Sequence, residues 1–130
     1  MAHFHIDYSP NLAERMDIRG FCVAIRDAAA ETGVFPVAGI RVRAIPAAHV
    51  VMADGDPEHA YLDLSVRLRG GRSLDAKTAA TAHIFAAAEA YCAEVMETSS
   101  FMLSMEMRDI DPGLSPKSSS IRAYLPEDLR

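Results

Sequence analysis

Two arginines, Arg41 and Arg43, stand two residues apart in segment 35–43, whose other residues are apolar or glycine. Side chains two apart on a β-strand leave the same face, so both guanidinium groups are expected side by side. Like charges in this arrangement repel each other, and a carboxylate that bridges them would offset the repulsion. The pair therefore predicts an acidic small-molecule ligand. The alternative is an edge strand whose charged outer face is solvated.

A third arginine, Arg72, follows two glycines and comes just before a predicted helix. The first turn of a helix offers free backbone N–H groups and the positive end of the helix dipole, and both favour an anion. Arg72 is therefore a candidate to join the pair at one carboxylated ligand. The alternative is a Gly-Gly turn that leaves this arginine in solvent.

Other kinds of chemistry have less support in the sequence. His3, His5 and Asp7 share one face of a predicted strand, but strand alternation accounts for their spacing, and no metal site is predicted. Segment 54–56 begins like a calcium loop and lacks the later positions of an EF-hand, so it is expected to be a turn. No G-x-S-x-G, Walker A or G-x-G-x-x-G motif occurs. Conventional hydrolase, nucleoside-triphosphate and dinucleotide sites are therefore not predicted.

Composition limits the class of protein and its partners. The 130 residues, 50% of them hydrophobic, suit one domain over 1–130. A formal net charge of -5 gives no general attraction to nucleic acid or anionic lipid, so neither is expected as a partner. The sequence has no apolar run of roughly 20 residues and no leader pattern, and a cytoplasmic protein is expected. Cys22 and Cys92 lack metal-site or redox-pair spacing and are interpreted as reduced core thiols.

Hydrophobic periodicity predicts the elements that would position the arginines. Apolar residues alternate with polar ones at 3–8, which indicates a first strand. Asp17 can cap a helix that ends at Thr32-Gly33, with Gly33 in the left-handed conformation. Further strands are predicted from Ile40 to about Ile45 and over 61–69.

The second half of the chain is predicted to repeat the order strand, helix, strand, beginning with the strand over 61–69. Ser73 is a good N-cap for a helix that runs to about Glu97, with one apolar stripe made of Ala80, Ile84, Ala88, Tyr91 and Val95. A fourth strand is expected over 101–108, followed by a turn-rich segment from about 111 with a short strand at 121–124. Two β-α-β halves predict an α+β two-layer sandwich with both helices on one face of a four-stranded sheet. Apolar residues left on the other face would favour oligomerisation.

Four segments taken together resemble the 5-carboxymethyl-2-hydroxymuconate Δ-isomerase family of the tautomerase superfamily. They are the strand that begins at Ala2-His3-Phe4, and segments 32–43, 52–55 and 71–74. The similarity runs from His3 to about Ala123 in matching order and spacing. The resemblance implies a homotrimer of β-α-β-β-α-β subunits, with active sites near subunit boundaries and with no metal or organic cofactor.

The activity that the resemblance implies is a ketonisation in the bacterial breakdown of homoprotocatechuate. A 2-hydroxydienoate that bears several carboxylates would become its 2-oxo isomer as a proton moves along the conjugated system. Arg41 and Arg72 are implied to neutralise the carboxylates and to stabilise charge on an enolate-like intermediate. Arg43 and Phe35 are implied to help bind this polycarboxylate substrate.

One position departs from the family pattern. Similar enzymes have proline after the initiator methionine, and its secondary amine is the catalytic base, whereas this chain has Ala2. If Met1 is removed, the α-amino group of Ala2, with a reference pKa of about 7.7 to 8, can take the role of base. If Met1 stays, the amine is displaced by roughly 3.3 to 3.6 Å of chain. The alternative function is therefore a carboxylate-binding homologue with little or no catalysis.

Overall fold

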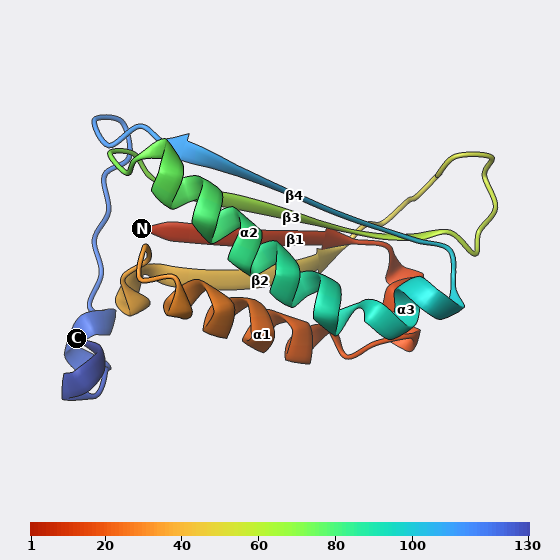
Figure 1. Ribbon diagram of the computed structural model, residues 1–130, viewed down its shortest axis with the longest axis horizontal. Helices are drawn as coiled ribbons and strands as arrows, with labels where there is room; N and C mark the ends of the chain where they lie inside the picture. Colours follow the sequence, from red (N-terminus) through yellow and green to blue (C-terminus); the bar gives the residue numbers. More distant parts are fainter.

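Four strands in the order β2-β1-β3-β4 form one layer of the molecule, and helices form the other (Figure 1). The computed structural model describes residues 1–130. The strands are β1 (Ala2–Tyr8), β2 (Ile40–Pro46), β3 (Ala60–Arg69) and β4 (Phe101–Ile110). β1 is parallel to β2 and antiparallel to β3, and β3 is parallel to β4. The predicted β-α-β-β-α-β fold is confirmed.

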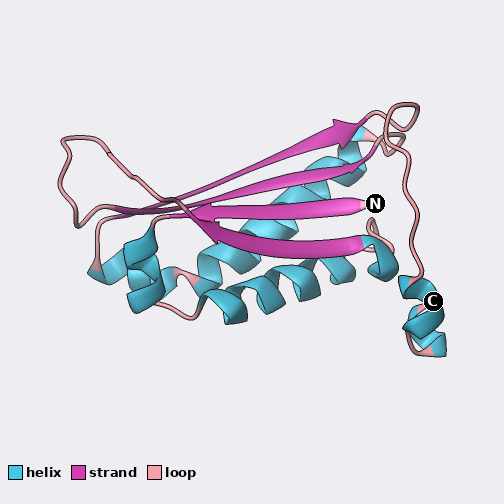
Figure 2. Ribbon diagram, turned by 180° about the vertical axis from the view of Figure 1, so that it is seen from behind, coloured by secondary structure: helices cyan, strands magenta, loops and turns pink.

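Both long helices cover the same face of the sheet, as the view from behind shows (Figure 2). They are α1 (Ile18–Glu31) and α2 (Leu74–Tyr91). The Ser73 hydroxyl accepts a hydrogen bond from the Ala76 N–H at 3.1 Å, which confirms the predicted cap. Asp17 is the residue before α1 but makes no side-chain cap bond, and Gly33 has the predicted positive φ of 71°. None of the helices is long and apolar enough to span a membrane.

The predicted long helix from Ser73 to Glu97 is interrupted at Cys92. This residue has φ -90° and ψ 5°, and its N–H is shared between the carbonyls of Ala88 and Ala90. Such a tightened turn ends α2, and the chain then resumes as the short helix α3 (Ala93–Thr98). The prediction of one continuous helix was therefore wrong at this point, because the apolar stripe continues across the break.

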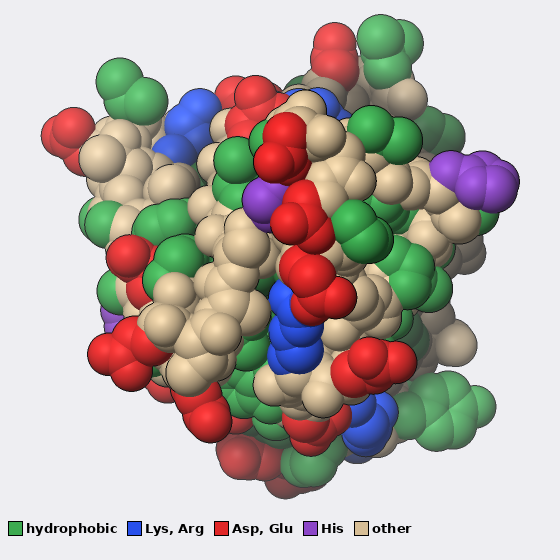
Figure 3. All heavy atoms as spheres, turned by 90° about the vertical axis from the view of Figure 1, so that its right-hand side faces the viewer, with side chains coloured by type: hydrophobic (Ala, Val, Ile, Leu, Met, Phe, Trp, Pro, Cys, Tyr) green, Lys and Arg blue, Asp and Glu red, His purple; other side chains and the backbone are tan.

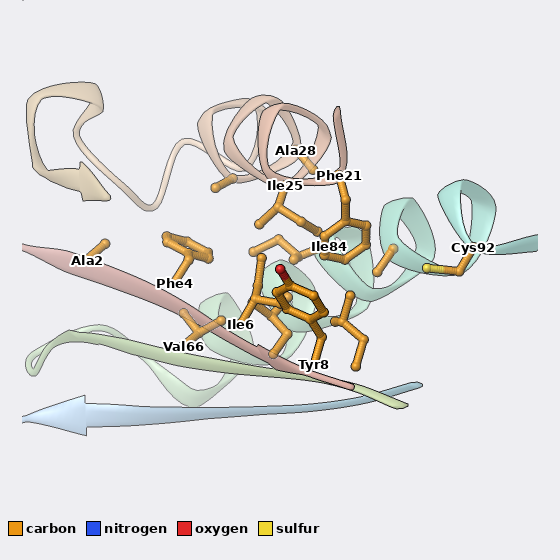
Figure 4. Packing of buried hydrophobic residues seen from close by; sticks show 14 of the residues in the cluster. Ala2, Phe4, Ile6, Tyr8, Phe21, Ile25, Ala28, Val66, Ile84 and Cys92 are labelled. Carbon is orange, nitrogen blue, oxygen red and sulfur yellow. The ribbon is translucent and has the colours of Figure 1, made fainter. Parts of the chain in front are cut away.

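Apolar side chains from both layers meet in one core (Figure 4). The strands contribute alternate residues, and the helices contribute the stripe that faces them. Fully buried side chains include Phe4, Ile6, Phe21, Ile25, Leu62, Leu64, Val66, Leu68 and Ile84. Of the two predicted core thiols, Cys92 is buried and Cys22 is only partly buried.

The other face of the sheet is uncovered and mostly polar. Partners in register form rows across the strands, and the row nearest the start of β1 consists of Arg41, His3, Arg67 and Arg108. Two rows further along β1, Asp7 stands opposite Asp63. The charge on this face therefore changes sign along the strands, and the exposed apolar residues there include Ile45 and Met102.

The chain after β4 returns past the start of β1 (Figure 1). It ends in two short 3-10 helices, η3 (Ile121–Tyr124) and η4 (Glu127–Leu129). The short strand predicted at 121–124 is therefore wrong. The N–H of Ala123 bonds to the Ser120 carbonyl and that of Leu125 to the Arg122 carbonyl, so these backbone groups are used locally rather than in a sheet.

Candidate active site

The α-amino group lies at the end of the central strand β1. Because β1 runs between β2 and β3, both sides of the first residues are held by neighbouring chain. The Met1 carbonyl accepts a hydrogen bond from the Arg69 N–H at 3.2 Å. On the β2 side stands Gly39, where an added Cβ would lie 3.2 Å from the Met1 nitrogen. The bare glycine backbone thus lets the amine fit at this end of the sheet.

A hollow of about 280 Å³ opens at this amine. Two segments far apart in the sequence line it. One is the turn that contains the 3-10 helix η2 (Val37–Gly39), and the other is the C-terminal segment 111–130. The lining residues are Met1, Pro36, Ala38, Gly39, Lys117, Ser119 and Arg122.

Positive charge surrounds the amine although the chain as a whole is acidic. Burial lowers the pKa of the Met1 amine from its ordinary value of 8.0, and the charges of Lys117, Arg72, Arg41 and Arg69 lower it further, in that order. None of these four side chains forms an ion pair with a carboxylate of the protein. The site therefore combines an amine that loses its proton more easily with several cations free to meet an anion.

Acidic side chains gather at the opposite end of the molecule (Figure 3). Loop 47–59 and α3 lie at that end and carry exposed carboxylates at Asp54, Asp56, Glu58, Glu94 and Glu97. These carboxylates account for part of the formal net charge of -5. They would repel an anionic ligand, whereas the cations around the amine would attract it.

Arg72 lies close to the amine, and the backbone holds it in place. Its Nε donates to the Val34 carbonyl at 3.0 Å and its Nη1 donates to the Arg69 carbonyl at 2.9 Å. A guanidinium has five N–H donors, so three remain for a ligand. The Gly-Gly turn before Arg72 thus positions the side chain, since Gly71 has φ 112°.

Arg41 and Arg43 share the exposed face of β2, as their spacing predicts. Arg41 is the direct partner of His3 and contributes to the electrostatic environment of the amine. Arg43 lies opposite His5, one row further from the amine, and is not among the charges that lower its pKa. The sheet therefore brings Arg41 to the amine more closely than Arg43.

Two of the residues implied by the resemblance are buried. The Ala2 side chain is 1% exposed, which fixes the start of β1 in the core. Phe35 is 4% exposed and packs edge-on against Phe4 with ring centroids 5.2 Å apart. Phe35 lines an adjacent hollow of about 270 Å³ rather than the one at the amine.

Sequence reasoning missed Lys117 and Arg122. Lys117 lies in the segment predicted as turn-rich, and Arg122 lies in the short strand predicted at 121–124. The only feature of the sequence that could have indicated their role in the site was the positive charge of their side chains. Their place in the site depends on the path of the chain after β4, which returns to the start of β1.

A larger hollow, of about 560 Å³, lies elsewhere, between α2 and β4. Its walls are mainly apolar, with Phe85, Met105 and Met107 among them, and its one cation, Lys77, is paired with Asp109 at 3.2 Å. It holds neither a free cation nor a candidate base. Nowhere do three His, Cys, Asp or Glu side chains come close enough together to hold a metal ion. The smaller hollow at the amine is therefore the candidate active site.

Comparison with known proteins gives one consistent result. Residues 2–125 match the family model of 5-carboxymethyl-2-hydroxymuconate isomerase. The chain is 32% identical over 123 residues to 5-carboxymethyl-2-hydroxymuconate Delta-isomerase of Escherichia coli, and the match covers 95% of this chain and 98% of that protein.

Comparison with solved structures indicates the same family. A crystal structure of 5-carboxymethyl-2-hydroxymuconate delta-isomerase matches with a TM-score of 0.89 at 27% identity, over 95% of this chain and 92% of the other. The crystal structure of a 5-carboxymethyl-2-hydroxymuconate isomerase from Deinococcus radiodurans R1 matches with a TM-score of 0.86 at 27% identity, again over 95% of this chain and 92% of the other. A fused 4-OT symmetric trimer shares the fold, with a TM-score of 0.62 at 13% identity over 89% of this chain and 93% of that one.

The resemblance of the four short segments is thus confirmed over nearly the whole chain. The matched region contains the arginines of β2 and of the Gly-Gly turn, and it includes Lys117 and Arg122 of the C-terminal segment. The chain therefore belongs to the 5-carboxymethyl-2-hydroxymuconate isomerase family.

Proposed function

We propose that the protein is a tautomerase that ketonises 5-carboxymethyl-2-hydroxymuconate or a closely related polycarboxylated 2-hydroxydienoate in aromatic catabolism, without a cofactor. The observation that carries the proposal is the hollow at the start of β1, where the Met1 amine has a lowered pKa and the cations that lower it have no carboxylate partner. A substrate with several carboxylates would supply the missing partners.

The proposed reaction moves one proton and changes no oxidation state. The neutral amine takes the proton of the 2-hydroxyl group, the electrons shift along the diene, and the amine returns the proton to a carbon at the far end of the conjugated system. One O–H bond is broken and one C–H bond is formed. Arg41 and Arg72 would stabilise the negative charge that builds up on the dienolate and its carboxylates.

The proposed base is the amine of Ala2 after removal of Met1. Backbone pairing holds Ala2 between Ile40 and Leu68, and its buried methyl group fixes the strand. A retained Met1 moves the amine by roughly 3.3 to 3.6 Å of chain. Proton transfer requires heavy atoms about 2.6 to 3.2 Å apart, so an offset of that size is enough to prevent it.

The proposal includes a homotrimer of single-domain subunits in the cytoplasm. The uncovered sheet face and its exposed Ile45 and Met102 support an assembly, because a second subunit would shield them from water. Two cysteines without a disulfide are compatible with a reducing compartment. Light scattering should give three times the protomer mass of 14.1 kDa.

The decisive experiment begins with the intact mass, which shows whether Met1 is present. Ketonisation of 5-carboxymethyl-2-hydroxymuconate is then followed by the change in absorbance, with chains that carry or lack Met1 and with Ala2→Pro as a control that restores the secondary amine. We expect turnover by the chain without Met1 and much less by the chain that keeps it. If neither the processed chain nor Ala2→Pro is active while both bind polycarboxylates, the protein is a carboxylate-binding homologue instead.

A further inference from the structure

We propose that the C-terminal segment 111–130 completes the substrate site, and that Lys117 and Arg122 bind the carboxylate that distinguishes a tricarboxylate from a dicarboxylate. The inference rests on the proposed function, because it concerns the same hollow and names the feature of the substrate that the segment recognises.

The first support is the position of the segment. Lys117, Ser119 and Arg122 supply three of the seven residues that line the hollow at the amine. The remaining wall comes from Met1 and the turn before β2. A ligand in this hollow would therefore lie between the start of β1 and the C-terminal segment, within reach of both basic side chains.

The second support is charge. Lys117 is the charged side chain that acts most strongly on the Met1 amine, ahead of Arg72 and Arg41. Neither Lys117 nor Arg122 forms an ion pair within the chain. Unpaired cations on one wall of a hollow repel each other and the protonated amine, and an anion placed among them removes that repulsion.

The third support is the number of carboxylates to be bound. Arg41 lies on the β2 side of the amine, and Arg72 is tied to the carbonyls of Val34 and Arg69. Neither lines the hollow itself, so each would meet a carboxylate of a ligand that extends beyond it. A third carboxylate needs a further cationic position, and Lys117 and Arg122 provide it from the side of the C-terminal segment.

The segment can be altered without disturbing the core. Its start is tied to the body by the hydrogen bond from the Gly70 N–H to the Ile110 carbonyl at 3.0 Å, and its end packs beside the turn at 35–38. Between these points its residues are exposed, apart from a half-buried Ser115 and Leu125. Loss of the Lys117 or Arg122 side chain therefore removes charge from the hollow and leaves the core packing unchanged.

A matched pair of small acids tests the proposal without requiring turnover. Tricarballylate is glutarate with one additional carboxylate on its central carbon. We expect the native chain to bind tricarballylate more tightly than glutarate in calorimetric titrations at fixed ionic strength. Lys117→Met with Arg122→Met should weaken tricarballylate binding about tenfold, the lower end of what charged hydrogen bonds contribute, and glutarate binding much less.

Two control variants separate recognition from general charge effects. Arg26→Met removes one positive charge from an exposed residue of α1 that pairs with Asp27 and does not line the hollow, and it should leave the affinity ratio of the two acids unchanged. Lys117→Arg keeps the charge and should preserve most of the preference. The proposal is overturned if the double variant weakens both acids equally, or if it weakens neither.

Turnover gives an independent readout. The ratio of kcat/KM for 5-carboxymethyl-2-hydroxymuconate to that for 2-hydroxymuconate, which lacks the carboxymethyl group, should fall about tenfold in the double variant. A native chain that converts neither compound contradicts the proposed isomerase function, and the affinity ratio of the two acids then still decides the role of the segment. Normal turnover with an unchanged ratio contradicts only the role of Lys117 and Arg122.

Discussion

The Nη2 atom of Arg41 lies 3.1 Å from Nε2 of His3, its direct partner across β2 and β1. Because a guanidinium can only donate, this imidazole nitrogen must accept, so His3 is neutral and carries its hydrogen on Nδ1. That second nitrogen is buried and has no hydrogen-bond partner. The contact orients the Arg41 guanidinium and requires an unprotonated histidine.

The His3 contact predicts a dependence of stability on pH. Burial, followed by the charges of Arg41, Arg67 and Arg43, lowers the pKa of His3 from its ordinary value of 6.5. Between the lowered pKa and 6.5 the unfolded chain binds more protons than the folded one, so stability falls as the pH drops through that range. The urea midpoint should decline less from pH 7 to pH 5 in His3→Gln than in the native chain, and parallel curves would refute this role of His3.

Substitution of Arg41 or Arg72 should weaken binding of a dicarboxylate by about 1.5 to 3 kcal/mol, because each loses a charged hydrogen bond. The two variants should differ in stability. Arg72→Ala also frees the carbonyls of Val34 and Arg69, at a cost of about 1 kcal/mol in the free energy of unfolding, whereas Arg41→Ala removes an exposed side chain. Titration calorimetry and urea unfolding measure both effects.

Arg43→Ala is the matched comparison for Arg41→Ala, since both side chains leave the exposed face of β2. Arg43 lies one row further from the amine, so we expect its loss to reduce glutarate affinity by less. If Arg43→Ala matches Arg41→Ala in affinity, the ligand extends along the strand. Unchanged affinity in both Arg41→Ala and Arg72→Ala would return these arginines to the role of solvated surface charges.

Gly39→Ala should report whether Met1 is present. The new Cβ would lie 3.2 Å from the Met1 nitrogen and 3.4 Å from its Cα, closer than ordinary contact, but 3.9 Å from the Ala2 nitrogen. We therefore expect the substitution to lower the thermal midpoint of the chain that retains Met1 and to be tolerated by the chain that lacks it. The same shift in both forms would mean that the strain lies elsewhere.

The two thiols should react slowly in the folded protein. Burial raises the pKa of the Cys92 thiol to about 11, and burial together with Asp17 raises that of Cys22. Because the thiolate is the reactive form, few molecules carry it at pH 8. Titration with a disulfide reagent should modify Cys22 before Cys92 and complete both only on unfolding. Rapid reaction of Cys92 in the native state would contradict its place in the core.

The fold was predictable where local pattern and tertiary structure agree. Alternation in 61–69 predicted β3 because every second side chain enters the core, and the Ser73 cap was visible because its hydroxyl acts only three residues away. In the same way, the alternation in the segment from Ile40 to about Ile45 predicted that Arg41 and Arg43 lie on one face of a strand. These are local consequences of the pleat and the helical turn.

The remaining features depend on the path of the chain. Lys117 and Arg122 reach the amine because the C-terminal segment crosses the end of the sheet, and no periodicity records that crossing. The residues at 121–124 favour a strand by type, but they bond among themselves as η3. Local hydrogen bonds, rather than pairing in the sheet, thus decide the structure of these residues.

The position of the chain's first residues in the middle of a sheet affects how the protein can be produced and matured. Any fusion tag placed before Met1 would have to pass through the hollow at the amine, so such a product would be blocked however well it folds. In the proposed mechanism the initiator methionine behaves as a pro-sequence one residue long. The activity of a freshly translated chain would then depend on an aminopeptidase, and the maturation of this enzyme would consist of a single cleavage.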